Sequence, residues 1–224
     1  MLRGATTQRG FSLVEILISL VVLGVMVALA APGFGEWLQN RQIRAAAEMT
    51  LNGLQLARAE AVRANAPERF QFVTDLTSTC ALTTGNDSSQ QQYVNWVVSS
   101  LDPTGKCDTF ANGNPLDPVN PQIVHKGTGE QGTPNAEITS VFLNAPPAPP
   151  GAPSAANVVT FGPLGNVIAN ADGSFSIVKV DVSNPWIGVG ARRPLRIVVN
   201  PGGATRLCDP LAPSTEPRGC PAWP

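Results

Sequence analysis

Glu15 stands at the start of a long apolar run, and its position there is the first chemical signal in this 224-residue chain. From residue 16 to residue 31 nothing is charged, and only Ser19 is strongly polar. Counted from Phe11, the segment holds about 20 residues, enough for a helix to span a bilayer. A carboxylate in such a helix costs roughly 2.5 to 3.5 kcal/mol at the helix centre. A chain keeps such a group mainly when it has a partner, so the segment is predicted to serve assembly as well as anchoring.

Four cysteines, Cys80, Cys107, Cys208 and Cys220, form the second chemical signal. They allow three disulfide pairings, and the local one joins Cys80 to Cys107 and Cys208 to Cys220. A disulfide that closes about 15 residues stabilises a fold by roughly 3 kcal/mol, which suits the Pro-rich stretch between Cys208 and Cys220. The alternative is a metal site built from the four thiolates. The absence of a Cys-x-x-Cys pair argues against it, so no metal is expected.

The basic residues gather toward the C-terminus. Residues 68–178 carry three basic residues against nine acidic ones, whereas residues 179–224 carry six basic residues against three acidic ones. A basic end on an acidic body is a mild indication of a polyanionic partner. Scattered surface charge is the alternative interpretation for each of these arginines.

No constellation typical of catalysis is present in the sequence. Residues 127–132 match the Gly-x-Gly-x-x-Gly spacing, but a dinucleotide site needs a helix to begin there, and Thr133-Pro134-Asn135 follows instead. The sole histidine, His125, lacks a neighbouring nucleophile motif and is interpreted as a surface or edge-strand residue. The chain is therefore predicted not to be an enzyme and to need no cofactor.

The helical pattern continues beyond the apolar run, to about Asn65. Pro32 should bend this long helix, because it removes one hydrogen bond and clashes with the preceding turn. After it, apolar residues recur at steps of three and four along one stripe: Ile43, Ala47, Leu51, Leu54, Ala57 and Ala61. A cleaved signal peptide is the competing interpretation, with Arg3 and Arg9 as its basic region. The length of the apolar run, Glu15 within it and the continuing helix count against that interpretation.

The rest of the chain is predicted to consist of strands and loops. Short segments rich in Val, Ile and aromatic residues, bounded by turn formers, predict strands at 69–73, 93–99, 158–161, 174–182 and 194–199. Residues 144–153 hold five prolines and predict an extended loop. The expected fold class is α+β, one long N-terminal helix whose second half packs on an antiparallel β-sheet.

Gly10-Phe11-Ser12-Leu13-Val14-Glu15, the apolar run and Pro32 together resemble the N-terminus of type IV pilins and type II secretion pseudopilins. The resemblance implies that a prepilin peptidase cuts after Gly10 and methylates Phe11. It also implies that the Glu15 carboxylate pairs with the Phe11 amino group of a neighbouring subunit, which removes two lone charges from an apolar environment at once. Arg3 and Arg9 place the leader in the cytoplasm.

Further segments resemble the GspH/FimT branch of minor pilins: residues 54–63, 159–167, 195–199, 206–210 and 217–220. The resemblance implies a type IV pilin-like fold with a leader at 1–10, a transmembrane helix at 11–31, a periplasmic helix half at 32–65 and a β-rich head at 66–224. The expected function is that of a minor pilin or pseudopilin, a single-pass inner-membrane protein that joins a type IV pilus or a secretion pseudopilus. Its implied partners are the inner membrane, the peptidase and other pilin subunits.

DNA capture for uptake is the alternative function, because part of the FimT branch contacts phosphate through a Gly-Arg-x-Arg motif. Here the matching residues are Gly203-Ala204-Thr205-Arg206, so the first arginine is absent and only Arg206 corresponds. Phosphate contact needs positive charge rather than fixed spacing. The other arginines that would supply this charge are Arg192, Arg193, Arg196 and Arg218.

Overall fold

The computed structural model describes residues 11–82, 95–109, 121–128, 136–141 and 157–221. The chain forms two compact units, Met1–Leu38 and Gln39–Pro224, and the second is called the head below. The described elements are α1 (Leu13–Ala64), β1 (Glu68–Phe72), β2 (Trp96–Ser99), β3 (Ile123–Gly127), β4 (Glu137–Val141), β5 (Val158–Phe161), β6 (Val167–Ile168), β7 (Lys179–Ser183), β8 (Leu195–Val199) and β9 (Thr205–Cys208).

Within the described residues, no single straight helix has both the length and the apolar character needed to cross a membrane. The two parts of α1, Leu13–Leu29 and Gly33–Ala64, meet those criteria together as a pair bent between them. The break contains Pro32, where the missing backbone N–H predicts a bend.

In the head, α1 buries the apolar stripe that its sequence predicts. Ile43, Ala47, Leu54, Ala57 and Ala61 are fully buried, and Leu51 packs against the same core. The helix ends at Ala64 because Asn65 adopts a left-handed conformation, with φ of 49°. The amide of Ala66 then donates to the carbonyl of Ala61 at 3.2 Å, which satisfies one of the last helical carbonyls.

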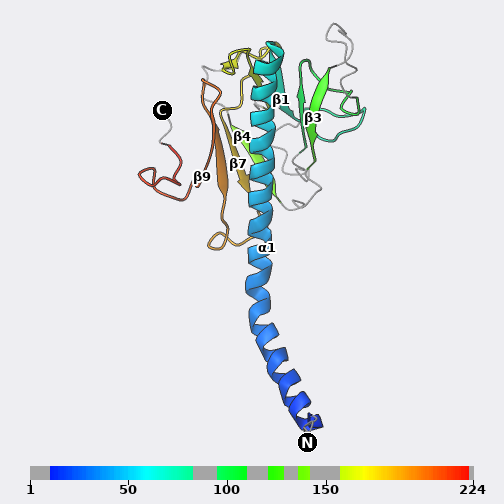
Figure 1. Ribbon diagram of the computed structural model, residues 1–224. Coiled ribbons are helices and arrows are strands. Elements are labelled where there is room, and N and C mark those ends of the chain that lie inside the picture. The colour runs from blue at the N-terminus through cyan, green and yellow to red at the C-terminus, as the bar shows by residue number, and fades with distance from the viewer. Residues whose placement is uncertain (1–10, 83–94, 110–120, 129–135, 142–156, 222–224) are drawn as a thin grey trace, which may run out of the picture. The chain divides into compact units, whose positions relative to one another are not determined.

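In the head, α1 packs against two antiparallel sheets (Figure 1). The first has the strand order β3-β2-β1-β5-β6, and the second has the order β4-β7-β8-β9. The sheets are joined beside β5, where the Ile177 amide donates to the Val158 carbonyl at 2.9 Å. The predicted α+β class, with antiparallel sheet against a long helix, is confirmed.

A tryptophan fills the space between α1 and the first sheet. The ring of Trp96 on β2 lies 5.5 Å from that of Phe70 on β1, which in turn makes an edge contact with Phe72. Two glycines make room for this ring. A Cβ on Gly53 would lie 2.8 Å from Trp96 Cε2, and one on Gly127 would lie 2.2 Å from the same atom. Neither position can therefore carry a side chain without moving the indole.

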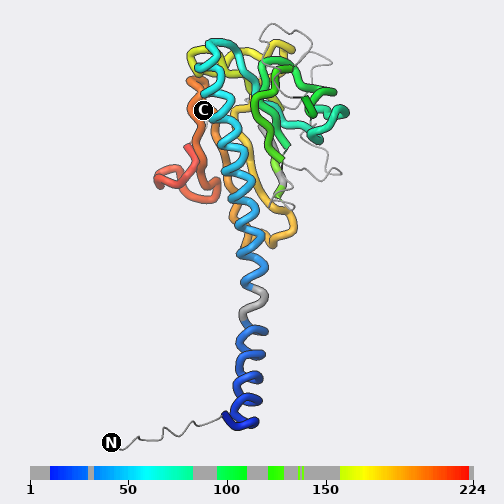
Figure 2. The backbone as a smooth tube through the Cα atoms, turned by 45° about the vertical axis from the view of Figure 1, so that its right-hand side comes forward, coloured from blue at the N-terminus to red at the C-terminus, as the bar shows by residue number. Residues whose placement is uncertain are grey.

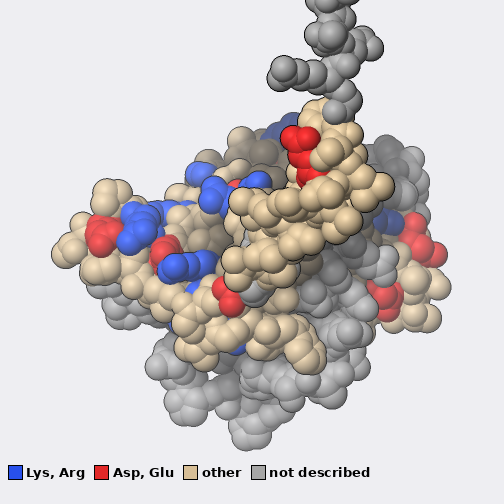
Figure 3. Space-filling model, turned by 90° about the horizontal axis from the view of Figure 1, so that it is seen from below, with Lys and Arg blue, Asp and Glu red and all other residues tan. Residues whose placement is uncertain are grey.

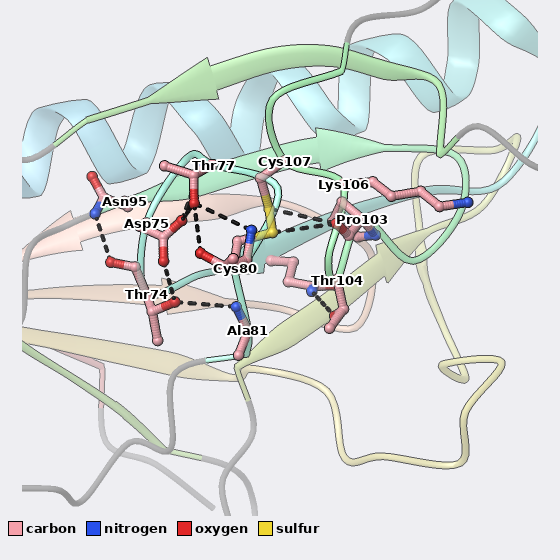
Figure 4. Close-up of a disulfide and its surroundings, with 12 residues drawn as sticks. Thr74, Asp75, Thr77, Cys80, Ala81, Asn95, Pro103, Thr104, Lys106 and Cys107 are labelled. Atoms are coloured by element: carbon pink, nitrogen blue, oxygen red, sulfur yellow. Dashed lines mark hydrogen bonds between the residues drawn. A yellow bond between two sulfur atoms is a disulfide. The ribbon is translucent and has the colours of Figure 1, made fainter.

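The structure contains both bonds of the local cysteine pairing, Cys80–Cys107 and Cys208–Cys220. Figure 4 shows the first, enclosed by turns that side chains hold in place. The Asp75 carboxylate accepts from the Thr77 amide at 2.8 Å, and the Gly105 amide donates to the Cys80 carbonyl at 2.8 Å. This disulfide belongs to a small second core around Val73, Val97 and Ile123.

Several strand predictions need correction. The segment predicted at 174–182 becomes regular only at Lys179, since Ser176 makes an isolated bridge with Val158. The sequence did not predict β3, β4, β6 or β9.

Residue 93 and the proline-rich stretch 144–153 lie outside the described residues, as do residues 129–132 of the glycine motif. His125 is exposed on β3, an edge strand, as predicted.

Candidate functional site

The start of α1 positions Glu15 in the first helical turn. Phe11 and Ser12 precede the helix, and the Ser12 hydroxyl accepts a hydrogen bond from the Glu15 amide at 3.2 Å. Ser12 therefore acts as the N-cap, and Glu15 occupies the third helical position. A carboxylate in the first turn is also favoured by the positive end of the helix dipole. Gly10 lies outside the described residues.

The apolar side chains after Glu15 point outward on every side of the helix. Among the described residues of this segment, none from Phe11 to Leu29 is buried. Ser19 satisfies its hydroxyl locally, because Oγ donates to the Glu15 carbonyl at 2.8 Å. A helix that is apolar all round requires another apolar environment. Glu15 is the one acidic side chain in that stretch.

Arg206, the strongest candidate for phosphate contact, is committed to the C-terminal loop. Its Nη2 atom donates to the Pro217 carbonyl at 2.6 Å and to the Gly219 carbonyl at 3.1 Å. The same loop is closed by Cys208–Cys220 and by a hydrogen bond from the Asp209 amide to the Arg218 carbonyl at 2.8 Å. The guanidinium thus clamps the disulfide loop onto β9.

The other predicted phosphate contacts also have partners, with one exception. Arg196 on β8 pairs with Asp181 on β7 through both carboxylate oxygens, at 2.5 and 3.1 Å. Arg218 pairs with Glu216 at 2.8 Å. Arg192 donates to carbonyls of its own loop, whereas the exposed Arg193 guanidinium has no ion pair with the described residues. Acidic and basic side chains are mixed on the face that Figure 3 presents, so the described arginines form no uniformly basic surface there.

Arg58 is a structural residue whose role the sequence did not reveal. Its Nε atom donates to the Gly165 carbonyl at 2.9 Å, and its Nη2 atom donates to the Gly202 carbonyl at 3.5 Å. Gly165 and Gly203 both have positive φ and approach each other closely, since a Cβ on Gly203 would lie 1.7 Å from the Gly165 carbonyl oxygen. One helix side chain therefore fixes two glycine turns from distant parts of the chain.

Glu68 is a buried acid at the start of β1. Its exposed fraction is 5%, and its Oε2 atom has no hydrogen-bond partner among the described residues. Burial raises the pKa of Glu68 to about 7, the charge of Glu60 adds to the rise, and Arg63 opposes it. The neutral form of the Glu68 carboxyl is thus favoured below about pH 7.

Nothing in the described part of the chain gathers three or more His, Cys, Asp or Glu side chains as a metal site would require. The features with chemical content are therefore the capped Glu15 on an apolar helix and a head closed by two disulfides.

Comparison with known protein families shows to which family the chain belongs. Residues 6–31 match the model of the prokaryotic N-terminal methylation motif, and residues 46–203, more than half of the chain, match that of the type II transport protein GspH. The chain belongs to the GspH family of minor pilins and pseudopilins. This confirms the family expected from the sequence. Members of this family are structural filament subunits.

One solved structure similar to this GspH-family chain is the crystal structure of the type IV minor pilin FimU from Pseudomonas aeruginosa. The two are 17% identical, the match covers 79% of this chain and 98% of FimU, and the TM-score is 0.40. No curated protein matches the chain.

Proposed function

We propose that this protein is a minor subunit of a filament assembled from the inner membrane, either a type IV pilus or a type II secretion pseudopilus. In the proposal, a prepilin peptidase cuts after Gly10 and methylates Phe11. Residues 11–31 hold the processed chain in the membrane as a single span, with the head, including the helix from residue 39, in the periplasm. The disulfide pairs Cys80–Cys107 and Cys208–Cys220 suit an oxidising compartment.

The observation that carries the proposal is the placement of Glu15. Ser12 caps the helix immediately after the proposed cleavage bond, so Glu15 occupies the first turn of an otherwise apolar segment. A lone carboxylate there is costly in lipid, and an amino group of a neighbouring Phe11 supplies the opposite charge. Pairing in the filament core removes both charges from an apolar environment, which drives the subunit from the membrane into the filament.

A deletion strain separates the two kinds of filament. Loss of surface pili with unchanged protein secretion assigns the chain to a pilus, and the reverse outcome assigns it to a secretion pseudopilus. Complementation with the wild-type chain restores the lost activity, whereas Gly10→Val leaves the chain unprocessed and fails to restore it. Normal pili and normal secretion in the deletion strain would contradict both forms of the proposal.

A further inference from the structure

Two aromatic side chains follow the apolar run of α1 and belong to the same compact unit, Met1–Leu38. Phe34 and Trp37 are three residues apart on the helix, and their rings stack with centroids 5.7 Å apart. Phe34 is 64% exposed and Trp37 is 52% exposed, so both rings reach the surface of the helix. The name "aromatic pair" is used for these two residues.

The aromatic residues of this segment occur only at its two ends. Phe11 is at the beginning and the aromatic pair is at the end, and no Phe, Trp or Tyr occurs from residue 12 to residue 33. Membrane-spanning helices concentrate tryptophan at their interfaces with water, because the indole ring is apolar and carries one polar N–H. The distribution therefore indicates that the aromatic pair marks the end of a span.

The charged residues mark the same boundary. After Glu15 the next charged residue is Glu36, which lies between the two aromatic residues, so residues 16–35 form an uncharged stretch of 20 residues. As a helix this stretch rises about 30 Å, which equals the thickness of the hydrocarbon core of a typical bilayer. The aromatic pair thus stands where that thickness ends.

This position does not depend on the angle of the bend in α1. The two parts of the helix meet between Leu29 and Gly33, and the tube in Figure 2 winds as a helix on both sides of that break. Phe34 follows Leu29 by five residues, which rise about 8 Å as a helix and reach at most about 18 Å when extended. The aromatic pair therefore stays close to the end of the span at any angle.

We propose that, before assembly, the aromatic pair lies in the headgroup layer of the membrane, on the side of the head, and fixes the depth of the span. The amphipathic indole of Trp37 suits the boundary between acyl chains and headgroups, and the stacked Phe34 ring adds apolar area there. Glu36, which is exposed between them, remains in the hydrated headgroup layer. This inference rests on the membrane anchoring in the proposed function.

The test uses the full chain in lipid nanodiscs, with Trp186 and Trp223 replaced by Phe, so that Trp37 and the buried Trp96 remain. The discs contain lipid that is brominated either at shallow acyl carbons near the headgroups or at deep ones near the bilayer centre. We expect shallow bromine to quench Trp37 about twofold more than deep bromine, as for an interfacial indole. The further replacement Trp37→Phe measures the background emission of Trp96.

Val25→Trp, combined with Trp37→Phe, is the matched control. Val25 lies in the middle of residues 16–35 and is 56% exposed, so deep bromine should quench an indole at this position more than shallow bromine. The chain that carries Val25→Trp with Phe34→Ala and Trp37→Ala tests the control of depth. There the difference between deep and shallow quenching at position 25 should shrink, because the residues that fix the depth of the span are gone.

Stronger quenching of Trp37 by deep bromine overturns the interfacial position of the aromatic pair and leaves the membrane anchoring intact. Absence of Trp37 quenching, in discs where the indole at position 25 is quenched, has the same consequence. An unchanged difference at position 25 after both alanine replacements overturns the control of depth.

Two further outcomes are distinguishable from these. An unquenched Trp37 whose emission shifts when a second chain is loaded into the disc assigns the aromatic pair to a contact between subunits, and overturns its place in the headgroup layer. A chain that does not enter the discs overturns the anchoring proposal and this inference together.

Discussion

The Arg58 side chain of α1 donates to the Gly165 carbonyl at 2.9 Å, across 107 residues of sequence. This contact connects the helix with the turn after β5, and through Gly202 it also reaches the turn before β9. The segments that hold Arg58 and Gly165, residues 54–63 and 159–167, are among those by which the sequence resembles its family. In the fold, the two Arg58 contacts hold these glycine turns against the helix.

Replacing Arg58 with Ala should destabilise the head. A charged hydrogen bond to a carbonyl contributes about 1.5 to 3 kcal/mol, so we expect a loss of about 2 kcal/mol. Urea unfolding of a fragment that begins at Gln39 measures it. Arg63→Ala removes an exposed arginine from the same helix and should leave the stability of the head close to that of wild type. Equal losses for the two variants would contradict the role given to Arg58.

Removing the Cys208–Cys220 bond should destabilise the head by about 3 kcal/mol, from the entropy of closing a loop of this size. The double replacement of both cysteines by Ser, followed by urea unfolding, gives the value.

Arg206→Ala in the disulfide-bonded chain should increase proteolysis within residues 209–219, because Arg206 holds the carbonyls of Pro217 and Gly219. Unchanged cleavage in Arg206→Ala would show that the clamp is dispensable.

The buried Glu68 carboxyl should make the head less stable as pH rises. Its pKa is raised to about 7 in the folded state, so the folded chain binds more protons than the unfolded one between about pH 4.5 and 7. Stability attributable to Glu68 is therefore fully present below the unfolded pKa and is lost as pH rises through about 7. A pKa that differs by one between the folded and unfolded chains corresponds to about 1.4 kcal/mol of stability.

The Glu68→Gln variant isolates this effect from that of other titrating groups. We expect it to unfold at higher urea than wild type at pH 8 and at a similar concentration at pH 5. Glu48→Gln, which removes an exposed acid paired with Arg44, should show no such pH-dependent difference. A Glu68→Gln curve that stays parallel to wild type from pH 5 to pH 8 would rule out a raised pKa.

DNA binding by the head should be weak. Arg196 and Arg218 are paired with acids, and Arg206 is held by carbonyls, so few free cations remain for phosphate. We expect no shifted DNA band at about 150 mM salt, where non-specific binding falls to a Kd of roughly 10⁻⁴ to 10⁻⁶ M. A retained complex that Arg206→Ala abolishes, in a head whose unfolding is unchanged, would instead support DNA capture.

The elements that the sequence predicted best are those stabilised by their own periodicity. The stripe from Ile43 to Ala61 repeats at helical spacing, and the strands around Phe70 and Val159 are dense in β-branched and aromatic residues. The unpredicted β3 and β9 have weaker patterns, because His125, Lys126 and Arg206 interrupt them. Such strands are formed by pairing with a neighbour rather than by local preference.

The residues with a chemical or structural role follow the same pattern. Those with a local signal in the sequence could be predicted, and those whose contacts join distant segments could not. Glu15 was evident because one carboxylate contrasts with an apolar run, and the cysteine pairing followed from proximity in sequence. The Asn40 contacts with residues 191 and 193 were not evident, since they join positions 151 and 153 residues apart. For Arg206 the sequence offered a free cation, and only the folded chain reveals the carbonyls that hold it.

The central claim is that Glu15 drives the processed chain from the membrane into a filament. The direct measurement is the amount of this chain in sheared filaments from cells that carry Glu15→Ala, with Glu36→Ala as the control. The account predicts that Glu15→Ala is cut after Gly10 and accumulates in the inner membrane, yet is absent from the filament fraction, while Glu36→Ala is incorporated normally. Incorporation of the processed Glu15→Ala chain at the wild-type level would contradict it.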